Sequence, residues 1–318
     1  MTLERDVGAM IAAARAGDRR ALARIITQVE ERLPDGAAAL ALLFPSGGRS
    51  WTTGITGAPG AGKSTLTGAM VAALRERETE VAVVAVDPSS PFTGGAILGD
   101  RIRMQHFIDD HGVYIRSMAS RGNLGGIAST TPRVLTILDG IGFPEVIVET
   151  VGVGQAEVEI ASAADTTIVV VNPRWGDSVQ AAKAGLLEIG DVFVVNKADR
   201  PGSEDTIRDL RLMLELGGKR DWVPPIVETV ATELTGIAEV WRAVDDHRAY
   251  LLEAGRLEVL RDRRAESMME EAVRDELRVR LQAVRNSDRW QELVGRVVER
   301  TIDPWSASEA LLAGGPQR

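Results

Sequence analysis

The nine residues from Gly57 to Thr65, with the sequence Gly-Ala-Pro-Gly-Ala-Gly-Lys-Ser-Thr, constrain the fold of this chain more than any other stretch. A glycine, four further residues and then Gly-Lys-Ser/Thr form the phosphate-loop pattern that joins a strand to a helix. The partly β-branched residues 51–56 precede the loop and predict a buried strand, and the apolar residues 66–74 predict a helix after it. Because strand and helix lie on the correct sides, a chance match in a glycine-rich turn is the weaker interpretation.

The chemistry expected of this loop follows from its residue types. Glycines let the backbone fold closely around an anion, and the helix N-terminus adds a partial positive charge. The Lys63 ammonium can reach the β- and γ-phosphates of a nucleotide, and the Ser64 hydroxyl can ligate Mg²⁺. We therefore expect a nucleoside triphosphate to be bound by Gly57, Ala58, Pro59, Gly60, Ala61, Gly62, Lys63, Ser64 and Thr65.

From residue 51 to about residue 230, short β-branched runs alternate with helical periodicity. This alternation predicts a mostly parallel sheet with helices on both faces, which places the chain in the α/β class as a P-loop nucleoside triphosphatase. The strands are expected at 51–56, 81–86, 113–117, 144–149, 166–172, 191–196 and 225–229. The helices between them are expected near 101–109, 126–140, 155–163, 178–189 and 203–216.

The tetrapeptide Asn196-Lys197-Ala198-Asp199 follows one of these strands, well downstream of the phosphate loop. A carboxylate at Asp199 can accept hydrogen bonds from N1–H and the 2-amino group of guanine, and adenine offers neither donor in that position. A site built to receive two hydrogen bonds rejects the wrong base by about 10⁴–10⁵-fold. The position of this tetrapeptide therefore predicts a guanine nucleotide, GTP or GDP.

A third group of polar residues follows the strand 144–149. Glu149 closes this strand, where a nucleotide hydrolase carries a carboxylate that holds Mg²⁺ directly or through water. Most such proteins have aspartate there, so Glu149 lengthens the reach by one methylene. The Gly152 N–H is expected to meet the γ-phosphate, and Gln155 is a candidate for orienting the attacking water. A solvent-exposed glutamate at a strand end is the competing interpretation of Glu149.

Two further carboxylates lie between these elements. Asp87 ends the strand that follows the phosphate-loop helix, so we expect it to point toward the metal. Asp100 stands at a helix start, where an N-cap role competes with a metal role. The predicted metal ligands are thus Ser64, Asp87, Asp100 and Glu149.

Composition excludes several function classes. The net charge of −9 over 318 residues argues against a nucleic-acid binder, because broad phosphate binding needs clustered Lys and Arg. The absence of cysteine excludes disulfides, thiolate metal sites and a Cys nucleophile. No apolar run approaches the roughly 18 residues of a membrane span, and the acidic N-terminus matches no signal peptide. We expect a cytoplasmic protein that binds neither nucleic acid nor membrane.

The three histidines, His106, His111 and His247, lie near acidic residues or on a charged helix. We expect them at surface or capping positions, without a metal site. Neither His111 nor His247 is followed by glycine three residues later, so an Asp-x-His-x-x-Gly cobalamin-ligand motif is absent.

Helical periodicity at both ends of the chain predicts extensions of the α/β core. We divide the chain into an N-terminal helical extension at 1–48, a P-loop GTPase domain at 49–250 and a C-terminal helical arm at 251–318. Two helices with a break at Gly17-Asp18 are expected in the first extension. The arm carries an apolar stripe, which either packs on its own domain or forms a dimerisation surface: Val273, Leu277, Leu281 and Val284.

Taken together, these stretches resemble the MeaB/ArgK-type family of P-loop GTPases, the G-protein chaperones of adenosylcobalamin-dependent methylmalonyl-CoA mutase. The resemblance covers most of residues 50–240. It is carried by Gly57–Thr65, the stretch Val86-Asp-Pro-Ser-Ser-Pro-Phe-Thr-Gly-Gly-Ala-Ile-Leu-Gly-Asp100, Ser117–Gly122 with Gly125-Gly126, Glu149–Gln155, Gly176–Gln180 and Asn196–Asp199. The two helical extensions also look like the N-terminal helices and C-terminal dimerisation arm of that family.

The resemblance implies a homodimeric GTPase that gates the loading of adenosylcobalamin into an acyl-CoA mutase and protects the mutase from inactivation. It implies that Asn196, Lys197, Ala198 and Asp199 recognise guanine, and that the backbone of Val230, Ala231 and Thr232 donates to the guanine oxygen. Val230 departs from the usual serine, which removes a side-chain brace but keeps the backbone contact. Arg174 occupies a place that glycine often holds.

Hydrolysis is expected to depend on Lys63, Glu149, Gly152 and Gln155, with charge on the phosphates stabilised by Lys63 and Mg²⁺. No built-in arginine finger can be assigned, and Arg116 or Arg121 is a candidate if a partner moves that loop. Two other functions compete. One is a transporter-associated ATPase or kinase, which the guanine-specific tetrapeptide disfavours. The other is a GTPase that inserts metal into another metalloenzyme, which usually brings Cys or His clusters.

Overall fold

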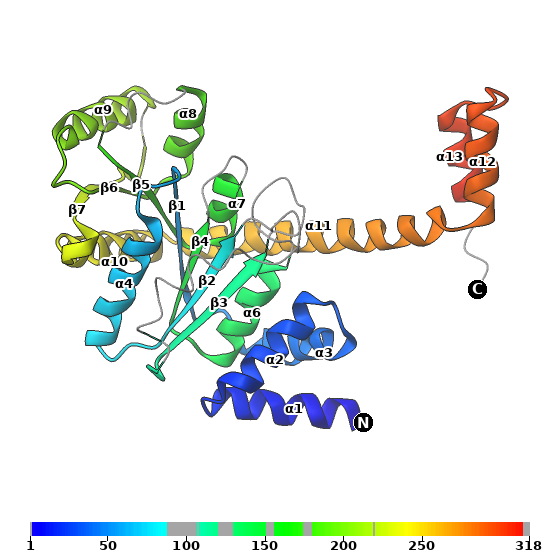
Figure 1. Cartoon of the computed structure of the whole chain (residues 1–318), viewed down its shortest axis with the longest axis horizontal. Coiled ribbons are helices and arrows are strands. Elements are labelled where there is room, and N and C mark those ends of the chain that lie inside the picture. The colour runs from blue at the N-terminus through cyan, green and yellow to red at the C-terminus, as the bar shows by residue number, and fades with distance from the viewer. Residues whose placement is uncertain are drawn as a thin grey trace. The chain divides into compact units, whose positions relative to one another are not determined.

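The computed structural model describes residues 2–87, 107, 109–119, 130–150, 156–173, 180–218 and 220–313, with backbone alone at 2–5, 87, 119, 156–159 and 180–184 (Figure 1). These residues form two compact units, Met1–Arg261 and Asp262–Arg318. The division falls within the long helix α11 (Arg256–Arg285).

The chain begins with three helices where the periodicity predicts two: α1 (Thr2–Arg15), α2 (Arg19–Glu30) and α3 (Pro34–Leu43). The Asp18 carboxylate caps α2, because it accepts from the N–H groups of Arg20 and Ala21 at 2.8 and 3.1 Å. Pro34 occupies the first turn of α3, where a missing N–H costs nothing, so a new helix starts there. Leu33, which follows α2 in the chain, is the exposed N-cap of α3.

In the described part of the chain, seven parallel strands form one sheet in the order β3-β2-β4-β1-β5-β6-β7 (Figure 1). Each strand lies where the alternating pattern predicts it, within one or two residues at either end. Four strands are buried along their whole length, which explains their near-continuous β-branched runs. The strands are β1 (Trp51–Gly57), β2 (Val81–Asp87), β3 (Val113–Ala119), β4 (Glu145–Thr150), β5 (Thr166–Val171), β6 (Val192–Asn196) and β7 (Ile226–Thr229).

The strand order makes β1 the point at which the chain changes direction across the sheet. From β1 the chain moves out to β2 and β3, returns to β4 beside β1, and continues on the other side with β5, β6 and β7. Open parallel sheets bind ligands at such a switch point, outside the carboxyl ends of the strands. The ends of β1, β4 and β6 therefore define the edge on which to look for the site.

Helices cover both faces of the sheet (Figure 1). On one face, α4 (Lys63–Glu76) and α10 (Ile237–Glu253) pack on the central strands through Leu66, Met70 and Trp241, and the Trp241 indole donates to the Met70 carbonyl at 3.1 Å. The other face is covered by the three N-terminal helices and by α6 (Thr131–Ile141), α7 (Ala156–Ala163), α8 (Gln180–Ile189) and α9 (Ser203–Leu216).

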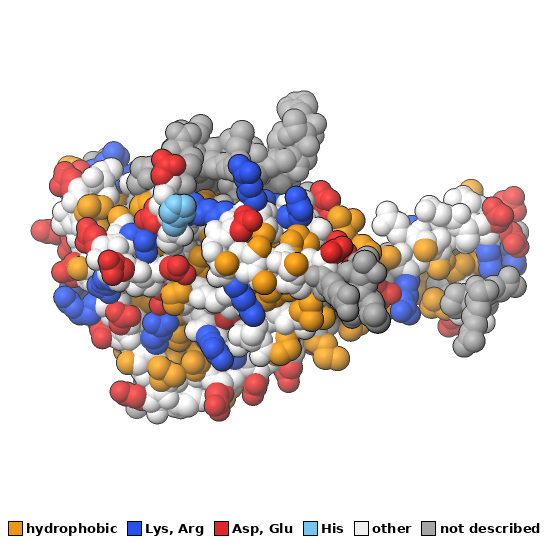
Figure 2. All heavy atoms as spheres, turned by 90° about the horizontal axis from the view of Figure 1, so that it is seen from below, with side chains coloured by type: hydrophobic (Ala, Val, Ile, Leu, Met, Phe, Trp, Pro, Cys, Tyr) orange, Lys and Arg blue, Asp and Glu red, His pale blue; other side chains and the backbone are white. Residues whose placement is uncertain are grey.

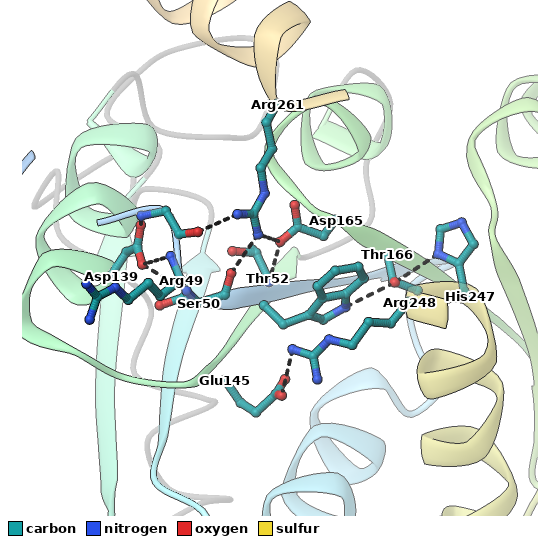
Figure 3. A network of polar contacts seen from close by, with 12 residues as sticks. Arg49, Ser50, Thr52, Asp139, Glu145, Asp165, Thr166, His247, Arg248 and Arg261 are labelled. Carbon is teal, nitrogen blue, oxygen red and sulfur yellow. Dashed lines mark hydrogen bonds and ion pairs between the residues drawn. The ribbon is translucent and has the colours of Figure 1, made fainter. Parts of the chain in front are cut away.

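A polar network occupies the opposite edge of the sheet, at the amino ends of the strands (Figure 3). The buried Asp165 carboxylate accepts from the Thr52 N–H at 2.8 Å and lies 3.5 Å from the Arg261 guanidinium. Arg261 also donates to the Ser50 carbonyl at 3.0 Å. Asp139 accepts from the three successive N–H groups of residues 48–50. These contacts fix the linker that leads from the N-terminal helices into β1.

His247 lies inside this network and not at the surface, which corrects the expectation from the sequence. Its apolar helix neighbours at i−3 and i+4, Val244 and Leu251, face the core, and His247 shares that face. Its Nδ1 lies 2.9 Å from the Thr166 hydroxyl, which also accepts from the Trp51 indole at 3.2 Å. Thr166 thus has its own proton available for Nδ1. The Nε2–H then faces Asp191, 3.4 Å away.

Burial governs the ionisation of three groups at this edge. It lowers the pKa of His247 to about 4 and raises the pKa of Asp191 to about 7. It also raises the pKa of Glu145 to about 7, although Arg248, 3.1 Å away, acts in the opposite direction. Arg248 in turn stacks over the Trp51 ring at 4.4 Å from its centroid (Figure 3).

The unit Asp262–Arg318 contains the rest of α11 together with α12 (Asp288–Val298) and α13 (Pro304–Ala313). The Ser287 hydroxyl caps α12, and the Asp303 carboxylate accepts from two N–H groups at the start of α13. Leu293 and Ala307 are buried in this unit. In contrast, a stripe along α11 is exposed to solvent, between 46% and 71% for each residue: Met269, Val273, Leu277 and Leu281.

The surface has mixed charge. On the face shown in Figure 2, acidic and basic side chains are interspersed. Among the helices that the structure describes, none combines the length and the apolar character needed to cross a membrane.

Candidate functional site

The loop between β1 and α4 has a shape that only glycine permits at two positions. Gly57 has φ 136°, and a Cβ atom there would lie 2.0 Å from the Val170 carbonyl oxygen of the neighbouring strand. Gly62 has φ 96°, and a Cβ atom there would lie 2.3 Å from the Asn196 amide nitrogen. Both conformations are unfavourable for other residues. These two glycines therefore allow the phosphate loop to lie close to β5 at Val170 and to β6 at Asn196.

Lys63 and Ser64 form the first turn of α4, where the N–H groups of the helix N-terminus and the helix dipole favour an anion. The Lys63 ammonium donates to the carbonyls of Gly57 and Ala58 at 2.8 and 3.1 Å, so it lies within the curve of the loop. Lys63 and Ser64 are both buried. The loop residues Pro59 and Gly60 are exposed, which leaves the outer side of the loop accessible to a ligand.

Glu149 comes from β4, the strand beside β1, and it is buried rather than exposed. One carboxylate oxygen lies 2.6 Å from the Ser64 hydroxyl and the other 2.9 Å from the Thr67 hydroxyl. The structure thus brings together two of the four predicted metal ligands. Hydroxyl and carboxylate oxygens next to a phosphate site are the donors that Mg²⁺ prefers, so these residues fit the ion.

The remaining predicted metal-side and catalytic residues are described only in part. Asp87 ends β2, two positions beyond Ala85, which is the register partner of Glu149. Its backbone therefore lies on the same edge of the sheet as Glu149. The Asp87 side chain, and all of Asp100, Gly152 and Gln155, lie outside the described residues.

Asn196 joins three segments at the carboxyl end of β6. Its amide nitrogen donates to the Ala61 carbonyl at 2.9 Å. Its amide oxygen accepts from the Thr229 hydroxyl at 3.1 Å and from the Ala231 N–H at 3.2 Å. The side chain is nearly completely buried. Asn196 therefore fixes the phosphate loop, the guanine tetrapeptide and the turn after β7 relative to one another.

The rest of the tetrapeptide lies over the phosphate loop. Lys197 has φ 61°, and its ammonium donates to the Gly60 carbonyl at 2.7 Å. The Ala198 N–H donates to the Thr229 carbonyl at 3.0 Å, which ties the tetrapeptide to β7. The Asp199 side chain is exposed. It is thus accessible to a base, as recognition of guanine requires.

The turn after β7 begins with Val230 and continues into the short helix η4 (Ala231–Glu233). The Val230 N–H donates to the Thr235 carbonyl at 3.1 Å, and the Ala231 N–H donates to Asn196 as described above. Thr232 is exposed. The structure places this turn beside the guanine tetrapeptide, where the resemblance puts the contact to the guanine oxygen.

One polar residue at this site was not predicted from the sequence, and one candidate has partners in another element. Thr67 is fully buried against Glu149, and its spacing of three from Ser64 on a helix was the available signal. Arg116, a candidate arginine finger, instead forms an ion pair with Glu30 and donates to the Thr27 hydroxyl at 3.1 Å. Arg116 lies in the middle of β3, where its register partner on β2 is Val84. Its contacts with Glu30 and Thr27 connect the sheet to α2.

A phosphate loop at the switch point, a carboxylate on the adjacent strand and an Asn-Lys-x-Asp segment over the loop define a P-loop GTPase. The chain belongs to the MeaB family: the family model described as "Methylmalonyl Co-A mutase-associated GTPase MeaB" matches residues 22–286.

Two relatives support this assignment. The chain is 45% identical over 300 residues to "Putative GTPase PYRAB02490" of Pyrococcus abyssi, covering 93% of each chain. It is 37% identical over 302 residues to "GTPase ArgK" of Escherichia coli, covering 91% of each chain. Among solved structures, "Crystal structure of LAO/AO transport system kinase" is similar with a TM-score of 0.69 at 29% identity, covering 96% of each chain. The protein is a GTPase that converts GTP to GDP and phosphate.

Proposed function

We propose that this GTPase assists the loading of adenosylcobalamin into methylmalonyl-CoA mutase or a related acyl-CoA mutase, and that it protects the loaded mutase. The observation that carries the proposal is the family match, whose description names a mutase-associated GTPase and which spans residues 22–286. The nucleotide site supports the GTPase half of the proposal, because the guanine tetrapeptide contacts the phosphate loop directly.

In this proposal each residue of the site has a defined task. Lys63 and the N–H groups at the start of α4 stabilise negative charge that develops on the phosphates. Ser64, Glu149, Asp87 and Asp100 would hold Mg²⁺, which neutralises phosphate charge when it is bound. Gly152 and Gln155 would contact the γ-phosphate and the attacking water. Asp199 accepts from guanine and thereby sets base specificity.

We further propose that the chain has three parts, the N-terminal helical extension 1–48, the GTPase domain 49–250 and the helical arm 251–318. We also propose that the protein is a homodimer and that the arm supplies the dimer contact. The exposed apolar stripe on α11 supports this proposal, because apolar side chains in a row on one helix are typical of a helix–helix interface.

The chaperone role is tested by measuring GTP turnover of the full chain alone and with a purified adenosylcobalamin-dependent acyl-CoA mutase. We expect the two proteins to co-elute and turnover to rise at least tenfold, because hydrolases that lack an arginine finger respond to a partner that completes the site. The absence of both a complex and stimulation would overturn the chaperone role and leave the GTPase assignment intact.

A second candidate is a transporter-associated ATPase or kinase, which is favoured by the similarity to a solved protein named as an LAO/AO transport system kinase. Competition for bound fluorescent GDP separates the two candidates: the GTPase proposal expects GTP to compete and ATP not to compete at a thousandfold higher concentration. Among the described residues, no group of three or more His, Asp or Glu could hold a metal ion.

A further inference from the structure

The Glu149 carboxylate meets two hydroxyl groups from one helix. Ser64 and Thr67 stand three residues apart on α4, so their side chains share one face of the helix. The Ser64 hydroxyl lies 2.6 Å from one oxygen of Glu149, and the Thr67 hydroxyl lies 2.9 Å from the other. Thr67 is fully buried, and Glu149 is 3% exposed. The two oxygens of the carboxylate are therefore fixed separately.

Thr67 also lies 3.0 Å from the Lys63 carbonyl, the usual partner of a threonine within a helix. A hydroxyl has a single proton, so Thr67 can donate to only one of these two acceptors at a time. A carboxylate accepts a stronger hydrogen bond than a neutral carbonyl does. The Thr67 proton is therefore directed to the Glu149 carboxylate and not to the Lys63 carbonyl within the helix.

The Glu149 carboxylate needs a second hydrogen-bond donor because the residue at this position is glutamate. Glutamate has one more side-chain torsion than aspartate, so a glutamate carboxylate at a strand end can occupy more orientations. If Ser64 turns its hydroxyl oxygen toward a metal, Glu149 loses that donor. Thr67 stands one turn further along α4, away from the helix N-terminus, and its hydroxyl remains available to Glu149.

We propose that Thr67 is a positioning residue that holds one oxygen of Glu149 so that the other oxygen stays directed toward Ser64 and the metal side of the nucleotide. The inference rests on the proposed metal role of Glu149. Thr67 acts through Glu149 and touches neither nucleotide nor metal. Residues that orient a metal-side carboxylate in this way typically change metal affinity by 10–100-fold when they are lost.

The test compares Thr67→Val, which keeps the shape and removes the hydroxyl, with Thr67→Ser, which keeps the hydroxyl. The readout is the Mg²⁺ concentration that half-maximally slows release of fluorescent GDP from the full chain, with GDP affinity in EDTA as reference. We expect Thr67→Val to raise that concentration about tenfold while GDP affinity in EDTA stays within threefold. Thr67→Ser should restore the wild-type value. Equal Mg²⁺ dependence in all three proteins would overturn the inference.

A double-mutant cycle with Glu149→Gln separates this inference from the proposed function. If Thr67 acts through Glu149, Thr67→Val has no further effect on Mg²⁺ dependence in the Glu149→Gln background. An undiminished effect in that background would contradict the inference while the metal role of Glu149 stands. A wild-type Mg²⁺ dependence of Glu149→Gln alone would refute the metal role itself. Should Thr67→Val fail to fold, Thr67→Ala takes its place in both experiments.

Discussion

At the scale of single residues, the nucleotide site depends on side chains that bond to two or three segments at once. Asn196 connects the ends of β6 and β7 to the phosphate loop, and Glu149 connects β4 to α4. Both side chains are almost completely buried, so a lost partner would leave an unpaired polar group. Asp199 differs from them, because it is exposed and accessible to the base.

Base specificity is expected to depend on Asp199. Asp199→Asn replaces an acceptor with a group that presents a donor to the guanine 2-amino group, so we expect GDP affinity to fall by about 10³–10⁴-fold. The matched control is Asp209→Asn, an exposed aspartate on α9, which should leave affinity unchanged. Isothermal titration calorimetry with GDP and ADP measures both. A loss of less than tenfold would contradict the assigned role.

At the scale of elements, α10 is attached to the sheet by a histidine that burial keeps neutral. His247 is 3% exposed, and Trp222 and Tyr250 pack around its ring at 5.0 and 6.2 Å between centroids. Since the pKa of His247 is lowered from 6.5 to about 4, the unfolded chain takes up a proton at a higher pH than the folded chain does. Stability contributed by this residue is therefore present above pH 6.5 and lost as pH falls toward 4.

The expected consequence is a pH-dependent difference between wild type and His247→Gln. At pH 7 the variant should be less stable, because it loses the ring packing. As pH falls to 4, the difference in unfolding free energy between the variant and wild type should shrink by up to roughly 3 kcal/mol, since only the wild type loses stability through histidine protonation. Urea unfolding at several pH values measures the difference, and a deficit that stays constant with pH would refute it.

Glu145→Gln is a matched variant for which the pH dependence of stability, relative to wild type, is expected to have the opposite sign. The pKa of Glu145 is raised from 4.5 to about 7, so the wild type loses stability as pH rises through this range. Relative to wild type, Glu145→Gln should therefore gain stability as pH rises from about 4.5 to 7. A common trend in both variants would indicate an effect of pH on the whole chain and not on these two groups.

At the scale of the whole molecule, the compact unit Asp262–Arg318 contrasts with the nucleotide-binding unit. Its apolar stripe on α11 stays exposed, with Val273 at 50% and Leu277 at 58%, and few of the residues described in this unit are buried. A helix that exposes a row of apolar side chains is stabilised when a second helix covers the row.

We expect Leu277→Glu to shift the protein from dimer to monomer, because the substitution puts a charge into the proposed interface. Gln282→Glu, at an exposed position outside the stripe, is the control and should remain dimeric. Sedimentation velocity at micromolar concentration reports the difference, with GTP turnover unchanged in both variants. A monomeric wild type, or a dimeric Leu277→Glu, would refute the interface.

Much of this protein was predictable because its signals are local. The seven strands follow from β-branched runs between turn residues, and the phosphate loop and the guanine tetrapeptide follow from short motifs with fixed spacing. Prediction was weaker where partners come from distant segments. Three terminal helices occur where two were expected, because Pro34 starts a new helix. The burial of His247 and the ion pair of Arg116 were not predicted, because their partners lie 81 and 86 residues away in the sequence.

The sequence by itself determined the succession of strands along the chain, the position of the nucleotide-binding loop and the preference for guanine. These properties depend on residue types at short range, where backbone propensity and hydrogen-bonding capacity act directly. Only the tertiary structure decided that Thr67 contacts Glu149, that Asn196 joins three segments and that His247 is buried. The physical reason is that parallel strands, adjacent in space and distant in sequence, bring these side chains together when the sheet forms.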